Sequence, residues 1–281
     1  MSLKNTVVLL NRPEKHFQES FYYQKVKAGI DAALDGTEYS LVIAQLDGGL
    51  PDSLTEGSLV NSGVLAIAPH VNHPAIEALE DSNIPASLIN CRSPKIAWVD
   101  TDNILGAVTM TEYLVSLGHK KILLVNGFPD SQNSIDRLEG FKRVLKKHNI
   151  EFNPKNVINC DFSVSLAYER MKNHLLQNKK SDFTAVFSTN DYMAVGIIRA
   201  FIDEKIRVPE DIAVVGFDDL DCAATFHTPL TTYRQPFENF GFLATKFLIK
   251  QMRTKTDKGL QAELLGELMI RRSCGGKKQA W

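Results

Sequence analysis

The chain has 281 residues, of which 44% are hydrophobic and 23% are charged, so it can bury a large core as one domain or two lobes. Its formal net charge of −1 provides no basic footprint for nucleic acid within this chain. No apolar run approaches the ~18 residues of a membrane-spanning helix, and no charged-then-apolar leader precedes the first strand-like run. The four cysteines (Cys91, Cys160, Cys222 and Cys274) lie far apart without a metal-binding spacing, as is typical of reduced cytosolic thiols. We therefore expect a cytoplasmic protein with no membrane partner.

Short apolar runs alternate with segments of helical spacing from the first residues onward. The runs predict strands over 6–10, 41–44, 64–68 and 86–89. Helices are predicted over 21–34, with Ser20 as N-cap, and over 74–80, with Pro74 in the first turn. The connection 45–63 is rich in Asp, Gly and Ser, and we expect at most a short helix there.

A second series of the same units follows Thr101. Asp102 is a predicted cap for a helix over 103–117, which Gly118 ends. Further helices are predicted over 135–148, 163–177, 191–204 and 238–253, and strands over 121–125, 157–158, 184–187, 212–215 and 267–271.

This alternation predicts an α/β fold with two doubly wound parallel-sheet lobes and a ligand cleft between them. The late helix and the last strand do not fit a finished second lobe, so the chain should cross back. We expect an N-terminal lobe of residues 1–101 and 236–266, and a C-terminal lobe of residues 102–235 and 267–281.

The sequence lacks the catalytic motifs that can be recognised by spacing. It has no GxGxxG after a strand, no GxxxxGK[ST], no HExxH and no GxSxG, and its seven histidines show no metal or triad spacing. We therefore predict a protein that is not an enzyme and has no catalytic residue, metal or cofactor. Asp218 and Asp219 follow the apolar run 212–215, at the sheet edge where open α/β folds bind ligands.

Several motifs together resemble the LacI/GalR family of bacterial transcription regulators. They follow the family's order across nearly the whole chain: DNxxG at Asp102, LxxLGH at Leu114, RxxGF at Arg137, NDxMA at Asn190, VPEDIAVVGFDD at Val208, and PLTT with QP at Pro229 and Gln235. The resemblance implies a periplasmic-binding-protein-like fold of type I, a homodimer, and a small-molecule effector, a sugar or sugar derivative, in the interlobe cleft. The effector would shift the protein between two lobe orientations and so change its affinity for operator DNA.

Family members begin with a helix-turn-helix DNA-binding headpiece and a hinge helix, which this sequence does not contain. We expect the effector-binding and dimerisation module of a repressor, which would contact operator DNA only as part of the full-length protein.

The resemblance also implies a set of ligand-binding residues. Arg137, Asp218 and Asn190 correspond to polar cleft residues, while Asp219 is expected to support its loop and Asp191 to cap a helix. Phe162 matches an aromatic residue that stacks on the ligand, with core packing as the alternative. The other implied residues are Tyr22 and Tyr23, one of which points inward; Asn90, where several members carry Asp; and Gln235 and Phe237 at the crossover between lobes.

Two other functions share this fold. The first is a solute-binding protein that delivers a sugar to a transporter. The missing leader and the VPEDIAVVGFDD run argue against this function. The second is an enzyme of a sugar pathway, which no nucleophile–base or metal constellation supports.

Overall fold

The chain folds into two compact units. The computed structural model describes residues 3–11, 17–46, 49–50, 54, 59–177, 182–225, 227–254 and 259–275. Unit 1 consists of Met1–Thr101 and Pro236–Leu264, and unit 2 of Asp102–Gln235 and Leu265–Trp281. Leu265 and Gly266 were expected in the N-terminal lobe but belong to unit 2, where the Gly266 N–H donates to the Tyr233 hydroxyl at 2.9 Å.

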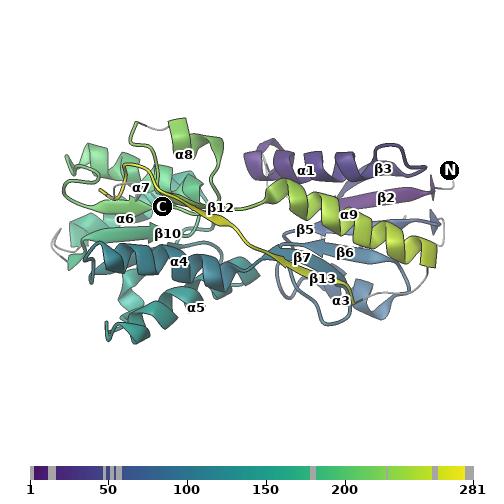
Figure 1. The fold of residues 1–281 in the computed structure, drawn as a ribbon, viewed down its shortest axis with the longest axis horizontal. Coiled ribbons are helices and arrows are strands. Elements are labelled where there is room, and N and C mark those ends of the chain that lie inside the picture. The colour runs from purple at the N-terminus through teal and green to yellow at the C-terminus, as the bar shows by residue number, and fades with distance from the viewer. Residues whose placement is uncertain are drawn as a thin grey trace. The chain divides into compact units, whose positions relative to one another are not determined.

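Unit 1 is built on a six-stranded parallel sheet in the order β13-β7-β6-β5-β2-β3 (Figure 1). Its inner strands are buried at every position, as expected of a parallel sheet covered on both faces. The strands are β2 (Thr6–Asn11), β3 (Ser40–Gln45), β5 (Gly63–Ile67), β6 (Ala86–Ile89), β7 (Ala97–Thr101) and β13 (Gln261–Leu264). A separate parallel pair joins β1 (Leu3–Lys4) to β4 (Leu59–Val60). Strand β4 lies in the connection 45–63, where at most a short helix was expected.

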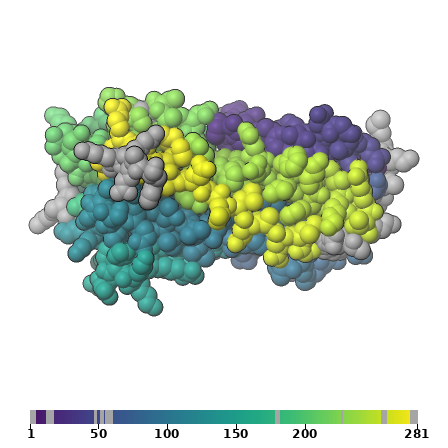
Figure 2. All heavy atoms as spheres, in the orientation of Figure 1, coloured from purple at the N-terminus to yellow at the C-terminus, as the bar shows by residue number. Residues whose placement is uncertain are grey.

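Helices α1 (Phe21–Leu34) and α9 (Phe237–Thr254) pack side by side in unit 1 (Figure 1). The buried residues of α3 (Pro74–Asp81) belong to an apolar cluster with residues of the strands. The predicted cap Ser20 is confirmed, since its Oγ accepts from the Tyr23 N–H. A short 3-10 turn, η1 (Phe17–Glu19), precedes α1. Helix α9 forms much of the face of unit 1 seen in Figure 2.

Unit 2 is built on a four-stranded parallel sheet in the order β11-β10-β8-β9 and an antiparallel ribbon of β12 and β14. The strands are β8 (Ile122–Asn126), β9 (Val157–Asn159), β10 (Ala185–Ser188), β11 (Ala213–Val215), β12 (Thr232–Arg234) and β14 (Glu267–Met269). The helices are α4 (Asn103–Ser116), α5 (Gln132–Lys147), α6 (Val164–Gln177), α7 (Asp191–Asp203) and α8 (Asp221–Thr225), with a 3-10 turn η2 (Pro154–Asn156) before β9.

Two apolar clusters cover this sheet. Helices α4 and α5 pack together and contribute Met110 and Phe141 to one cluster. Helices α6 and α7 pack together and contribute Met171 and Ile197 to the other. The prediction of a mixed α/β protein with parallel sheets is therefore confirmed.

The local signals in unit 2 were mostly right. The Oδ1 of Asp102 caps α4 by accepting from the Leu105 N–H, and Gly118 adopts φ 93° after the helix. The assignment of Asp191 as N-cap was wrong, because Asn190 is the cap and its Oδ1 accepts from the Met193 N–H at 2.8 Å. Helix α8 was not predicted, and α5 begins three residues before the predicted start.

None of the helices in the described part of the chain is long and apolar enough to cross a membrane. All four cysteines lie in described segments and are free thiols.

Candidate functional site

Polar side chains gather where the strands of unit 2 end. Asn126 ends β8, Thr189 and Asn190 follow β10, and Asp218 follows β11. Because these strands are parallel, their carboxyl ends meet at one edge of the sheet, which is where open α/β sheets bind ligands. Arg137 from α5 and Gln235 after β12 join the same cluster.

Arg137 is the buried cation of this cluster, with 2% of its surface exposed. Its Nε donates to Oδ1 of Asn103 at 2.8 Å, and its Nη1 donates to the carbonyl oxygen of Thr189. The guanidinium lies 3.9 Å from the ring centroid of Phe217, and its Nη1 lies 3.8 Å from Oδ1 of Asp218. Two donors of Arg137, a residue expected to bind the ligand, therefore hold protein groups.

Asp218 is the acceptor beside Arg137. Its backbone has φ 120°, in a region that favours glycine, and 9% of its surface is exposed. Burial raises the pKa of Asp218 to about 6, although the charge of Arg137 and the hydrogen bond from Gln235 lower it. A carboxyl group held in this way can accept hydrogen bonds from a hydroxylated ligand.

Gln235 completes the acceptor side of the cluster. Its Nε2 donates to Oδ1 of Asp218 at 2.6 Å, and its N–H donates to the Asp218 carbonyl oxygen at 3.3 Å. Its Oε1 is buried and has no hydrogen-bond partner in the described part of the chain. Buried carbonyl oxygens are normally satisfied, so this atom is a place for a donor from outside the protein.

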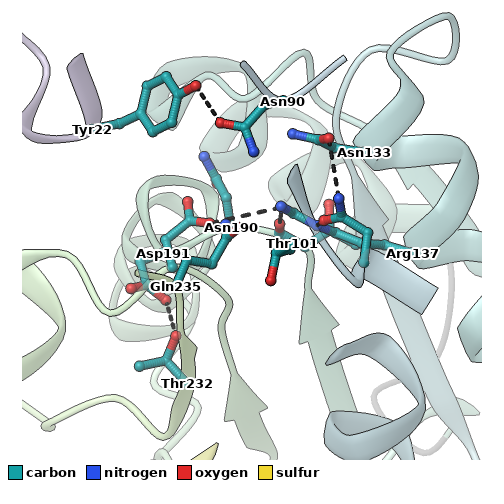
Figure 3. A network of polar contacts seen from close by, with 12 residues as sticks. Tyr22, Asn90, Thr101, Asn133, Arg137, Asn190, Asp191, Thr232 and Gln235 are labelled. Carbon is teal, nitrogen blue, oxygen red and sulfur yellow. Dashed lines mark hydrogen bonds and ion pairs between the residues drawn. The ribbon is translucent and has the colours of Figure 1, made fainter. Parts of the chain in front are cut away.

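Asn190 and Asp191 follow β10 but differ in what they can offer. Because Oδ1 of Asn190 caps α7, the group that Asn190 can present to a ligand is its amide nitrogen. Asp191 is fully buried and accepts from the Thr232 hydroxyl at 2.6 Å (Figure 3). It also accepts from the Leu220 N–H at 2.8 Å. Burial, followed by the nearby charge of Asp218, raises the pKa of Asp191 well above its ordinary value. Asp191 therefore fixes the loop that carries Asp218, a role that the sequence analysis did not assign to it.

Asp219 has the supporting role that was expected of it. Its Oδ2 lies 2.7 Å from Nε of Arg234, and its Oδ1 lies 2.6 Å from Nη2 of Arg271. These two ion pairs join the loop after β11 to β12 and to the segment after β14.

Phe162 lies against the backbone where β8 ends. A Cβ atom at Gly127 would be 2.1 Å from its ring, and the ring meets Phe128 edge-on with centroids 5.9 Å apart. Phe162 is half-buried and also packs against the cluster of α6 and α7. Both expected roles, packing and ligand stacking, are compatible with this position.

The expected site residues of unit 1 are divided between an edge cluster and the core. The Tyr22 hydroxyl donates to Oδ1 of Asn90 at 2.5 Å (Figure 3), and its ring meets Phe237 edge-on at 5.1 Å. Nδ2 of Asn90 donates to Oδ1 of Asp100 at 2.9 Å, so an Asp at position 90 would face a second carboxylate. Tyr23 is 2% exposed and lies in the core.

Sequence reasoning missed the groups that hold these residues in place. Asn103 belongs to the DNxxG motif and Thr189 directly precedes NDxMA, but only the structure shows that both accept hydrogen bonds from Arg137. Arg92 lies 3.5 Å from Oδ2 of Asp100 and 3.1 Å from Oε1 of Glu263, and no motif signalled it. Within the described residues, no group of His, Cys, Asp and Glu side chains could hold a metal ion.

Comparison with known proteins connects this geometry to a family. Residues 111–274 match the family described as periplasmic binding protein-like domain. The chain is 28% identical over 274 residues to the HTH-type transcriptional regulator CelR of Thermobifida fusca, covering 95% of this chain and 80% of that protein. It is 26% identical over 261 residues to the HTH-type transcriptional repressor PurR of Photobacterium profundum, covering 90% and 77%. Among solved structures, it resembles a complex of the transcriptional regulator CelR with cellobiose, with a TM-score of 0.86 at 26% identity over 96% of this chain and 84% of that chain.

Proposed function

Because this chain belongs to the LacI family of transcriptional regulators and carries their periplasmic binding protein-like domain, we propose that it senses a small-molecule effector and thereby controls the binding of operator DNA by the full-length regulator. The effector is a sugar or sugar derivative. The observation that carries this proposal is the gathering of Arg137, Asn190, Asp218 and Gln235 at the carboxyl edge of the unit 2 sheet. The similarity to a regulator solved with cellobiose supports the choice of a sugar.

Residues of both units take part in the proposed binding. Tyr22, Asn90 and Phe237 form the group in unit 1, and the family resemblance predicts that this group contacts the same effector as the group in unit 2. Phe162 would stack on the apolar face of a sugar ring. Tyr23 supports α1 from the core rather than contacting the ligand.

The proposed mechanism is a population shift between two arrangements of the regulator. An effector changes this equilibrium only by the difference between its affinities for the two states. A change from 1:99 to 99:1 requires about 5.5 kcal/mol of differential binding. Several charge-assisted hydrogen bonds of the kind that Asp218 can accept are sufficient for this.

The alternative of a solute-binding protein for a transporter is not favoured, because the relatives are transcriptional regulators. For the same reason we propose a cytoplasmic protein without enzymatic activity. We also propose a homodimer, which sedimentation velocity tests directly: a single monomeric species at micromolar concentration contradicts it.

Isothermal titration calorimetry with cellobiose and a panel of mono- and disaccharides tests the proposed function. We expect one of these sugars to bind, and Asn190→Ala to weaken that binding by about ten-fold, since one buried hydrogen bond is lost. Repeating the titration with Arg137→Ala tests whether this buried cation contributes to affinity. Unchanged affinity in both variants would remove Asn190 and Arg137 from the binding site.

A further inference from the structure

The cation at the unit 2 edge is held in place by protein groups. Arg137 is 2% exposed, its Nε is bonded to Asn103, and its Nη1 is bonded to the Thr189 carbonyl oxygen. One face of its guanidinium lies on Phe217. Two of the guanidinium donors are therefore engaged by protein acceptors, and the carboxylate of Asp218 lies beside the same group.

The groups that this edge offers to a ligand include two oxygen acceptors. One is the Asp218 carboxylate, whose Oδ1 receives the Gln235 amide and lies beside the charge of Arg137. The other is Oε1 of Gln235, which is buried and without a partner among the described residues. The amide orientation is fixed by chemistry, because exchanging the two Gln235 atoms would place its carbonyl oxygen against the carboxylate.

From this arrangement we infer that the effector is uncharged and directs hydroxyl donors at Asp218 and Gln235, so that phosphorylated and carboxylated sugars are rejected. The inference rests on the proposed function and specifies the chemistry of its ligand. It distinguishes neutral sugars from sugar phosphates, between which the sequence could not decide.

Charge balance supports the rejection of anions. Arg137 and Asp218 offset each other, so an anionic ligand would bring an uncompensated negative charge next to a carboxylate. Arg234 and Arg271, which lie beside the same loop, are both paired with Asp219. A hydroxyl group, in contrast, forms a charge-assisted hydrogen bond with Asp218 and satisfies the buried oxygen of Gln235. Sites built to receive a donor strongly disfavour ligands that lack it.

Calorimetry with matched neutral and anionic sugars tests the inference on the whole chain. D-Glucose is paired once with glucose 6-phosphate and once with D-glucuronate. D-Ribose is paired with ribose 5-phosphate, and cellobiose with its 6′-phosphate. We expect each anionic member to bind at least ten-fold more weakly than its neutral partner. An anionic member that binds as tightly as its partner would overturn the inference and leave the proposed function in place. Absence of binding in every pair would instead contradict the proposed sugar sensor, and the inference with it.

The variant Asp218→Asn separates electrostatic rejection from simple lack of space. Removing the carboxylate leaves the charge of Arg137 without its partner. We therefore expect the neutral sugar to bind more weakly and the anionic sugar to bind more tightly. The ratio of the two affinities should fall by at least ten-fold. Asp221→Asn changes the net charge equally at an exposed residue three positions away and should keep the wild-type preference. Circular dichroism confirms that each variant is folded. A preference that is the same in Asp218→Asn as in the wild type shows that this carboxylate does not select the ligand.

Discussion

Arg137 joins three segments of unit 2 through one guanidinium group. It binds the start of α4 through Asn103, the loop after β10 through Thr189, and the aromatic ring of Phe217 after β11. These segments carry the proposed site residues Asn190 and Asp218. A change at Arg137 is therefore expected to act on the whole edge of the sheet.

The stability of unit 2 should depend strongly on this group. We predict that Arg137→Ala lowers the free energy of unfolding by about 3 to 5 kcal/mol, because it leaves Asp218 and two carbonyl acceptors buried without their cation. Urea denaturation followed by circular dichroism measures the loss. Arg143→Ala is the matched control on the same helix, since Arg143 is 57% exposed and its ion pair with Glu139 should contribute little. Equal losses for the two variants would show that Arg137 is not a structural clamp.

The pH dependence of stability should report Asp218. Its pKa rises from an ordinary value of 3.8 to about 6 on folding, so the folded protein binds more protons than the unfolded chain between these pH values. The favourable contribution of Asp218 is therefore present below pH 3.8 and lost as the pH rises to about 6. Asp191 contributes with the same sign, because burial raises its pKa as well.

We predict that Asp218→Asn makes the free energy of unfolding less dependent on pH between about 4 and 6. Urea denaturation at several pH values in this range measures the slope, with Asp221→Asn as a control. A slope that stays at the wild-type value in Asp218→Asn would contradict the raised pKa.

Motifs in the sequence could locate the polar residues of the site but could not say which atoms remain available. Arg137, Asn190 and Asp218 were identified by resemblance. The structure shows that Arg137 is bonded to the protein and that Oδ1 of Asn190 caps a helix. Hydrogen-bond partners far apart in the sequence decide these roles, and local spacing contains no information about them. Tyr22 and Tyr23 illustrate the same limit, since only the packing of α1 determines which ring is buried.

At the scale of elements, the sequence predicts those whose signals are local. The predicted helix over 21–34 and the strand over 86–89 agree with α1 and β6 at every residue, because a capping serine marks the helix and a short, mostly apolar run marks the strand. Strand β13 escaped prediction because it lies at the sheet edge, where only alternate residues are partly covered. Its strand conformation depends on pairing with β7, which is distant in sequence.

The contact between α1 and α9 depends on two glycines. A Cβ atom at Gly29 would lie 1.9 Å from the Glu238 carbonyl oxygen, and one at Gly241 would lie 2.0 Å from the Val26 carbonyl oxygen. We predict that Gly29→Ala destabilises unit 1 by about 1 to 3 kcal/mol, because the backbones must separate. The higher helix propensity of alanine, about 1 kcal/mol, would by itself stabilise α1, so a measured loss isolates the steric effect. Gly259→Ala, with no atom within 4 Å, is the control in the same urea experiment.

At the scale of the whole molecule, the chain builds two units that each have their own sheet and core. Helix α9 belongs to unit 1 although most of unit 2 precedes it in the sequence. The chain therefore passes between the units three times, after Thr101, Gln235 and Leu264. Gln235, the last residue before one of these passages, also donates to Asp218, so a residue of the proposed site is adjacent to a connection between the units.

This organisation makes the proposed two-unit binding testable by calorimetric unfolding. A ligand that binds only the folded state stabilises it by RT ln(1 + [L]/Kd), about 2.7 kcal/mol at a concentration of 100 Kd. If the effector contacts both units, the sugar that binds most tightly in the titration panel should raise the unfolding temperature of both in differential scanning calorimetry. If only unit 2 binds it, the transition of unit 1 should stay in place.

The variant Tyr22→Phe tests the contribution of unit 1 directly. It removes the hydroxyl bonded to Asn90 without removing the ring packed on Phe237, and it should reduce the ligand-induced shift in unfolding temperature. A shift confined to one transition and unaffected by Tyr22→Phe would restrict the effector to the residues of unit 2.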